Sequence, residues 1–135
     1  MVRKTLLDSD ILSALMKRNA DVVSRAREYL RDHEQLTFSS ITRYEILRGL
    51  KAKRAVAQHA RFDEFCENCQ ILPITNDVVN RAADIYAELH RGGQLIGDAD
   101  ILIAATALVH DLDLASNNVA HFERVKGLTV ATWMV

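Results

Sequence analysis

The residues best suited to chemistry in this sequence are carboxylates, amides and one hydroxyl placed next to short apolar runs. They fall in four separate segments and comprise Asp8, Asp10, Glu45, Asp98, Asp100, Ser116, Asn117 and Asn118. Mg²⁺ and Mn²⁺ prefer carboxylate oxygens and water as ligands, and clustered carboxylates repel one another unless a cation lies between them. A cation held in this way activates water and orients a phosphodiester for in-line attack. These residue types therefore indicate a hard-cation site suited to phosphodiester hydrolysis.

The elements that must position these residues are short strands alternating with helices. Apolar patterns predict strands at residues 5–7, 35–38, 70–74, 112–115 and 128–131. Helical spacing is present in the ranges 11–15, 21–32, 41–50, 55–69, 76–91 and 98–109. This alternation predicts an α/β fold with three layers, in which helices cover both faces of a central parallel sheet. Ligands bind beyond the carboxyl ends of such strands, where the polar segments fall.

Composition places the chain among ordinary globular proteins. It has 135 residues, of which 49% are hydrophobic and 26% charged, so we expect a single domain over residues 1–135. The formal net charge of −1 excludes a strongly basic overall field, but it allows local basic patches. No apolar run is long enough to span a membrane, and acidic residues come too early for a signal peptide. A cytoplasmic location without membrane contact is expected.

Structural roles compete with the catalytic interpretation of several acids. Asp8 or Asp10 can cap the helix that follows them, and Asp98 can cap the helix predicted at residues 98–109. The pattern Thr42-x-x-Glu45 matches a capping box, which satisfies backbone donors at a helix start. The joint placement of the acids, more than any single residue, therefore supports a site.

Asp100 precedes the densest apolar stretch of the chain, where a carboxylate needs a partner or a metal. Asn117 and Asn118 alone would be an ordinary turn. The isolated pair Cys66-x-x-Cys69 lacks a second pair for zinc, and we expect two small residues on one helix face. The five histidines are scattered and are expected to be surface or structural groups.

Four blocks of the sequence resemble, in order and spacing, the motifs of PIN-domain proteins. They are residues 6–12 (LLDSDIL), 39–50 (SSITRYEILRGL), 96–105 (IGDADILIAA) and 114–118 (LASNN) followed by Phe122. The resemblance extends over essentially the whole chain. Within that family, the blocks are most similar to the VapC-type toxin ribonucleases of bacterial toxin–antitoxin pairs.

The resemblance implies a three-layer α/β/α PIN-like domain that acts as a toxin and hydrolyses RNA with water activated by Mg²⁺ or Mn²⁺. It assigns the catalytic and metal-ligand positions to Asp8, Glu45 and Asp100, with Glu45 acting directly or through water. It assigns supporting positions to Ser9, Asp10, Asp98, Ser116, Asn117 and Asn118.

Two departures from the family pattern bear on activity. Asp10 stands where the family usually has Asn, and Asn118 occupies the fourth acidic position, which removes one negative charge. Asp98 falls where many relatives have an uncharged residue. The register of the third block therefore selects Asp100 as the main ligand.

Residues 41–65 are the segment expected to contact binding partners. Residues 43–61 contain six basic residues and one acidic residue. This excess of positive charge can bind along an RNA backbone or can form a solvated helix surface. The predicted RNA-binding residues are Arg43, Arg48, Lys51, Lys53 and Arg54. The resemblance also implies a homodimer and a small cognate antitoxin whose helix lies in an apolar groove. The apolar excess near residues 41–50 and 55–65 is consistent with such a groove.

Other functions remain open at this point. Because of Asn118, the chain can also be a PIN domain that binds RNA or an antitoxin without cutting. Asp8-Ser9-Asp10 also fits the D-x-D opening of a haloacid dehalogenase-type phosphatase. That enzyme needs a second acid where Leu102 lies. A receiver-like signalling domain needs a lysine that the strand at 112–115 lacks.

Overall fold

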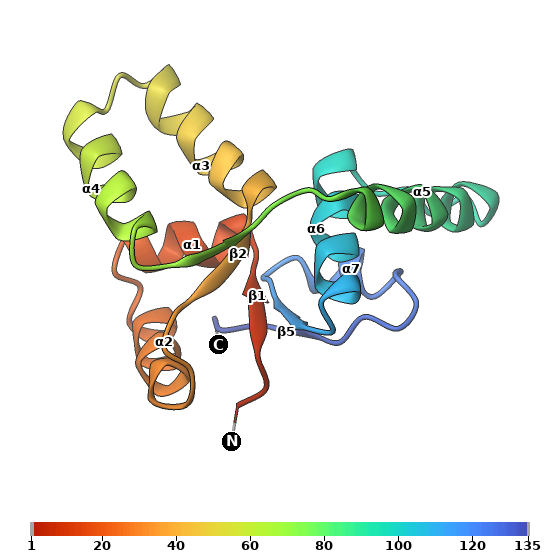
Figure 1. The fold of residues 1–135 in the computed structure, drawn as a ribbon, viewed down its shortest axis with the longest axis horizontal. Coiled ribbons are helices and arrows are strands. Elements are labelled where there is room, and N and C mark those ends of the chain that lie inside the picture. The colour runs from red at the N-terminus through yellow and green to blue at the C-terminus, as the bar shows by residue number, and fades with distance from the viewer. Residues whose placement is uncertain (1, 135) are drawn as a thin grey trace.

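Five parallel strands form the centre of the computed structural model, which describes residues 2–134. The strands are β1 Thr5–Leu7, β2 Thr37–Ser39, β3 Gln70–Leu72, β4 Asp113–Ala115 and β5 Val130–Ala131. They lie in the order β3-β2-β1-β4-β5. Helices pack on both faces of this sheet, as Figure 1 shows, so the predicted three-layer α/β/α class is confirmed.

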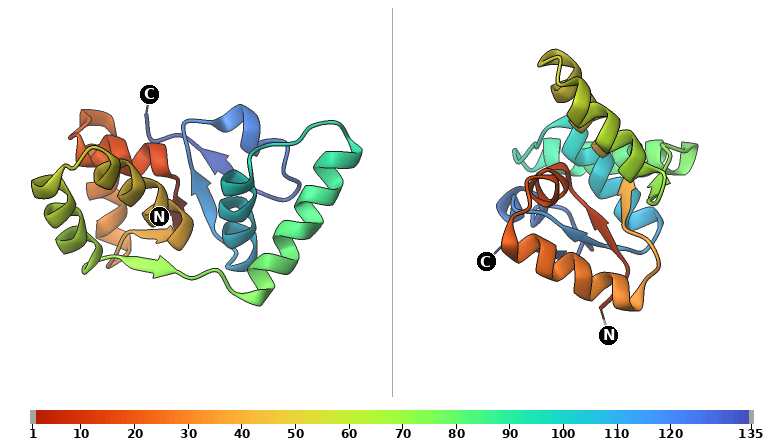
Figure 2. Two further views of the ribbon diagram at one scale, coloured as in Figure 1. Left: turned by 90° about the horizontal axis from the view of Figure 1, so that it is seen from above. Right: turned by 90° about the vertical axis from the view of Figure 1, so that its left-hand side faces the viewer.

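The helices divide into two groups. Their bounds are α1 Ser9–Met16, α2 Ala20–Asp32, α3 Ser40–Ala52, α4 Val56–Cys66, α5 Asn76–Arg91, α6 Asp98–Val109 and α7 Val119–Phe122. One core contains buried residues of α1, α2 and α4, and the other contains those of α5, α6 and α7. The left view of Figure 2 shows the strands running between the two groups. In the described part of the chain, no helix has the length and apolar character needed to cross a bilayer.

Alternating side chains of the strands supply both cores. Leu6 packs among the residues of α5 and α6, whereas Leu7 packs among those of α1 and α2. Both leucines are almost completely buried, and each contributes about 1.5–3 kcal/mol by leaving water. Leu114 and Ala115 repeat the alternation on β4. Because both faces of β1 and β4 are covered, the last two residues of each strand are apolar and buried.

The strand order reverses between β1 and β4. The chain passes from β1 outward to β2 and β3, and then returns to place β4 on the other side of β1. Leu7 pairs with Ala115, and the next backbone amide, that of Asp8, donates to the Ala115 carbonyl at 2.9 Å. A parallel sheet opens a crevice for ligands at such a reversal, beyond the carboxyl ends of its strands.

Two expected helix caps are wrong, one by three residues and the other by one. Ser39 caps α3 by accepting a hydrogen bond from the Thr42 amide, so the capping box predicted at Thr42 and Glu45 does not form. Gly97 rather than Asp98 occupies the cap position of α6. In each case the cap is the residue at which the extended backbone ends, and composition alone does not reveal that residue.

The helix after β1 begins earlier than its apolar residues indicate. It starts at Ser9, and Asp8 is its cap, accepting from the Ser9 amide at 2.8 Å. Asp10 lies in the first turn and does not cap the helix. The backbone leaves β1 and enters α1 within one residue, which fixes the direction of the Asp8 side chain.

The two cysteines do not share a helix face. Cys66 is the last residue of α4, and Cys69 lies beyond it, just before β3. Both are free thiols, and burial raises the pKa of Cys69 to about 12 and also raises that of Cys66. Thiols held in the neutral form are weak nucleophiles and weak metal ligands.

Candidate active site

Asp8 lies at the carboxyl end of β1 and is only 6% exposed. One carboxylate oxygen accepts from the Ser9 amide at 2.8 Å, and the other accepts from Ser116 Oγ at 2.7 Å. Burial raises the pKa of Asp8 to about 7, the Ser116 hydrogen bond opposes that rise, and the charge of Asp10 adds to it. Asp8 is thus a buried carboxyl whose negative charge is poorly compensated.

Asp10 faces the same crevice from the first turn of α1. Its Oδ2 accepts from the Asn117 amide at 2.9 Å, which ties α1 to the turn after β4. Its Oδ1 is buried, with no hydrogen-bond partner among residues 2–134. Burial raises the pKa of Asp10, because an ionised carboxylate loses hydration there. A buried carboxylate oxygen without a donor is a site that a cation can satisfy.

Glu45 reaches the site from the second turn of α3. Ser9 Oγ donates to its Oε1 at 2.5 Å, and a guanidinium nitrogen of Arg48 lies 3.7 Å from its Oε2. The carboxylate that the sequence pattern offered as a helix cap therefore points across to the start of α1. Ser9 fixes its position, and Arg48 lies at the solvent-facing rim.

Asp100 enters from the first turn of α6. Burial raises its pKa, the charge of Glu45 raises it further, and His121, whose Nδ1 lies 3.7 Å from Asp100 Oδ2, opposes the rise. Asp98, two residues earlier, is exposed and has no hydrogen bond or ion pair within the described range 2–134. The two acids of this segment thus have different surroundings, and Asp100 is the one that joins the site.

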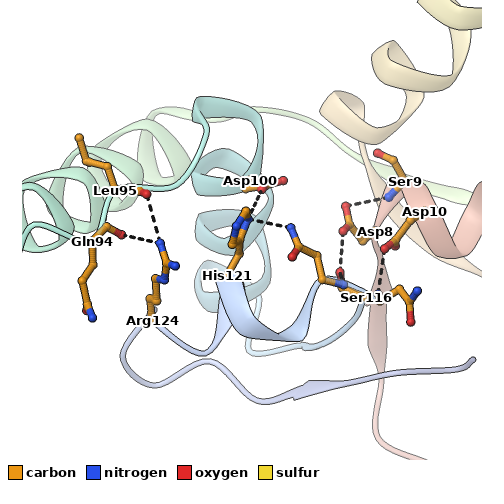
Figure 3. Close-up of polar contacts among 11 residues, drawn as sticks. Asp8, Ser9, Asp10, Gln94, Leu95, Asp100, Ser116, His121 and Arg124 are labelled. Atoms are coloured by element: carbon orange, nitrogen blue, oxygen red, sulfur yellow. Dashed lines mark hydrogen bonds and ion pairs between the residues drawn. The ribbon is translucent and has the colours of Figure 1, made fainter. Parts of the chain in front are cut away.

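The turn after β4 completes the arrangement. Ser116 is fully buried, and its Oγ accepts from the Asn118 amide at 2.9 Å while it donates to Asp8. The Asn118 side-chain nitrogen lies 2.8 Å from His121 Nδ1. Figure 3 shows His121 between Asp100 and this turn. From the sequence, His121 was expected to be a surface or structural group, like the other histidines. The spacing Asn118-x-x-His121 in a short helix was the available signal.

The four polar segments meet as predicted, beyond the carboxyl ends of β1, β2 and β4. Repulsion between Asp8 and Asp10, between Asp8 and Asp100, and between Asp100 and Glu45 places their carboxylates in one electrostatic cluster. Within residues 2–134, however, no three His, Cys, Asp or Glu side chains already form a metal-binding group. Ser9, Ser116 and His121 each hold one of the carboxylates apart.

The donors nevertheless fit a hard divalent cation. All the acids supply oxygen, burial raises the pKa values of Asp8, Asp10 and Asp100, and Asp10 Oδ1 lacks a donor. A divalent charge would offset the repulsion that these carboxylates experience when ionised.

The predicted RNA-binding residues separate into two classes. Arg43 is tied to α4, where it pairs with Asp63 at 3.1 Å and lies over the Phe62 ring, so it is not a free phosphate ligand. Lys51, Lys53 and Arg54 are exposed. A cavity of about 310 Å³ between α1, α3 and α4 is lined by Glu45 together with Lys17, Ile46, Leu50, Lys53 and Arg61, among others. Lys17 and Arg61 were not among the predicted RNA-binding residues.

The sequence profile of the PIN domain family matches residues 5–128 of the chain. The protein belongs to the PIN domain family. Ribonuclease VapC2 of Haemophilus influenzae is 33% identical over 133 residues, which are 97% of this PIN domain and 98% of the relative. Ribonuclease VapC19 of Mycobacterium tuberculosis is 32% identical over 120 residues, with 87% and 90% of the two chains covered.

Solved structures agree with this assignment. DNA-bound VapBC from Salmonella typhimurium superposes with a TM-score of 0.85 at 26% identity and covers 98% of this PIN domain and 99% of that chain. A toxin-antitoxin complex from Klebsiella pneumoniae gives 0.74 at 25% identity, with 97% and 99% covered. The PIN-domain resemblance of the four sequence blocks is confirmed. The phosphatase and receiver alternatives are therefore set aside.

Proposed function

We propose that this PIN domain is the toxin of a toxin–antitoxin pair and acts as an endoribonuclease dependent on Mg²⁺ or Mn²⁺. The observation that carries the proposal is the convergence of Asp8, Glu45 and Asp100 at the strand-order reversal. Its support includes 33% identity to a ribonuclease over nearly the whole chain. The oxygen donors and the buried, unpartnered Asp10 Oδ1 favour a hard cation.

Asp8, Asp100 and Glu45 are the residues that would hold the cation, and it would supply an activated water and offset phosphate charge. A pKa near 7 leaves Asp8 partly protonated at neutral pH, so Asp8 would give up that proton in order to hold the cation. Ser116 and Ser9 keep the carboxylates of Asp8 and Glu45 oriented toward the crevice. Asp10 adds negative charge next to Asp8.

The basic rim of α3 and α4 is the proposed path of the RNA backbone. Lys53 and Arg61 line the cavity that reaches Glu45, and Lys51 and Arg54 are exposed beside it. Lysine and arginine bind phosphates without reading sequence. Aromatic residues for base stacking are sparse on this segment. Phe62 is completely buried, which leaves Tyr44 as the exposed one of the two. Recognition therefore depends on RNA shape more than on stacking.

The same cavity is the proposed docking place for an antitoxin. It combines apolar side chains of Met16, Ile46 and Leu50 with a polar end at Glu45. An amphipathic helix fits such a groove by its apolar face, and a basic side chain on it can approach the carboxylates. Support comes from the similar Klebsiella pneumoniae structure, which is a toxin-antitoxin complex. Co-purification with the product of an adjacent small gene, lost in Leu50→Glu, tests this.

We also propose a homodimer, as the family resemblance implies. Val79 and Tyr86 on α5 and Leu95 beyond it are large apolar residues with 41–49% exposure. Light scattering of the purified chain should give twice the monomer mass of 15.2 kDa. A monomeric mass at all protein concentrations would contradict the homodimer and leave the nuclease proposal unaffected.

The deciding experiment is incubation of total cellular RNA with the purified chain in Mg²⁺, in Mn²⁺ and in EDTA. Asp100→Ala is the inactive variant, and Asp98→Ala is its matched control because Asp98 is exposed outside the site. Discrete fragments that need metal and disappear only in Asp100→Ala are expected. No cleavage with any metal, while RNA or antitoxin still binds, would instead identify a non-cutting binding module, with Asn118 as the first residue to change to Asp.

A further inference from the structure

His121 has an unassigned place inside the candidate active site. It lies on α7, directly before Phe122, whose complete burial fixes the helix against the core. Its Nδ1 is 3.7 Å from Asp100 Oδ2 and 2.8 Å from the side-chain nitrogen of Asn118. Figure 3 shows the ring reaching toward Asp100 from below.

The ring nitrogen next to Asp100 is suited to ligation. An Asn118 amide that donates to Nδ1 requires a lone pair on that nitrogen, which places the ring proton on Nε2. Rotating the Asn118 amide by half a turn presents its oxygen at the same place. Asp100 Oδ2 at 3.7 Å and the Asn118 side-chain amide at 2.8 Å then both lie near His121 Nδ1.

The spacing of these atoms matches one ion. Ligands about 2.1 Å from a shared cation lie roughly 3 to 4 Å from each other, and the observed 3.7 Å between Nδ1 and Oδ2 falls in this range. The His121 side chain is 44% exposed and that of Asp100 is 26% exposed, so the point between them is open to solvent and to ions.

We propose that His121 is a nitrogen ligand of the cation held by Asp100, and that it gives this PIN domain a preference for Mn²⁺ over Mg²⁺. The inference rests on the proposed function and specifies its metal. Mg²⁺ binds oxygen and retains water, whereas imidazole nitrogen suits transition metals, whose affinities rise from Mn²⁺ through Co²⁺. A site made of carboxylates alone would lack this selectivity.

The other described histidines do not offer this chemistry. His59 pairs with Asp63 on α4, His33 contacts the Val2 carbonyl, and His90 stacks on Tyr86. His110 is the exposed residue that follows α6, and its side chain makes no hydrogen bond or ion pair among residues 2–134. His110→Asn is therefore a matched control for His121→Asn, which replaces the ligand nitrogen by an amide of similar reach.

The direct test is pulsed electron paramagnetic resonance of the metal-free protein titrated with Mn²⁺, which detects coupling between Mn²⁺ and a coordinated ¹⁴N nucleus. The coupling is expected in the unchanged protein and in His110→Asn, and it should be lost in His121→Asn. Unchanged protein labelled with ¹⁵N-histidine should show the ¹⁵N coupling instead. This labelling tests ligation without any mutation, so the answer does not depend on how a variant folds.

Calorimetry supplies an independent readout. Loss of a supporting metal-site partner typically costs 10–100-fold in affinity, so His121→Asn should weaken Mn²⁺ binding by at least roughly tenfold. The loss should be larger for Co²⁺ and absent for Mg²⁺. His110→Asn should leave all three affinities unchanged.

Mn²⁺ that binds without histidine coupling, or with unchanged affinity in His121→Asn, would overturn the assignment of His121 while leaving the nuclease proposal intact. Absence of Mn²⁺ binding would overturn it as well. The RNA cleavage assay with Mg²⁺ then decides separately whether the proposed function stands.

Discussion

Ser116 Oγ donates a 2.7 Å hydrogen bond to Asp8 Oδ2, although the two residues are 108 positions apart in the chain. Ser116 follows β4 and Asp8 follows β1, and these strands are neighbours at the reversal of strand order. Because both residues are buried, the bond orients a carboxylate that water cannot solvate. The hydroxyl thus positions the acid at the centre of the candidate site.

Removing this hydroxyl should destabilise the protein. Ser116→Ala leaves a buried carboxylate oxygen without its donor, which costs about 1–3 kcal/mol and raises the pKa of Asp8 further. Urea unfolding of the metal-free protein measures the loss, which should be greater at pH 8 than at pH 5 because the bond favours ionised Asp8. The exposed Ser24→Ala is the control. Equal stability of Ser116→Ala and unchanged protein at pH 8 would contradict this role.

The metal-free protein should lose stability as pH rises from about 4 to about 7. The folded pKa of Asp8, about 7, exceeds its ordinary value of 3.8, so the folded state binds more protons than the unfolded state over this range. The contribution of Asp8 to the free energy of unfolding is complete below pH 4 and is lost as pH passes 7. Between these values the free energy of unfolding falls by about 1 kcal/mol for each pH unit.

Asp8→Asn should flatten that dependence, since the amide has no charge to bury, and saturating Mg²⁺ or Mn²⁺ should restore the stability of unchanged protein at pH 8. Melting temperatures between pH 4 and 8 measure both effects. A pH dependence that persists in Asp8→Asn would assign it to Asp10 or Asp100, whose pKa values are also raised by burial.

Asp98 and Asp100 should differ strongly in their effect on RNA cleavage. Asp100 lies close enough to Glu45 and His121 for both residues to shift its pKa, whereas Asp98 is exposed at the start of α6. Loss of a metal-ligand carboxylate removes several kcal/mol of transition-state stabilisation, so Asp100→Ala should lower kcat/KM at least roughly a hundredfold. Asp98→Ala should stay within a few-fold. The reverse order would shift the catalytic register by two residues.

Arg43 and Arg61 should separate fold stability from RNA binding. Arg43 pairs with Asp63 and covers Phe62, so Arg43→Ala should lower the melting temperature with little change in the salt dependence of RNA affinity. Arg61 lines the cavity near Glu45. In the inactive Asp100→Ala background, Arg61→Ala should therefore weaken RNA binding and reduce the salt slope of RNA affinity by about one. Fluorescence anisotropy at several salt concentrations distinguishes them, and equal slopes would remove Arg61 from the RNA path.

The sequence by itself determined the fold class and the candidate carboxylates. Short apolar runs and helical spacing are local properties, so the alternation of β1 to β5 with the helices was readable without contacts. Asp8, Glu45 and Asp100 were among the acids found close to a strand end or a helix start, and the family resemblance selected them from this set. Parallel strands then bring such positions to one edge of the sheet.

Only the tertiary structure decided how the side chains are used. Glu45 bonds to Ser9 instead of capping its helix, Arg43 is tied to Asp63, and His121 lies against Asp100. Each relationship joins residues at least 20 positions apart. Their contacts depend on the strand order and on where each helix begins. Local periodicity carries neither, since the free energy of a long-range contact depends on which elements the whole chain packs together.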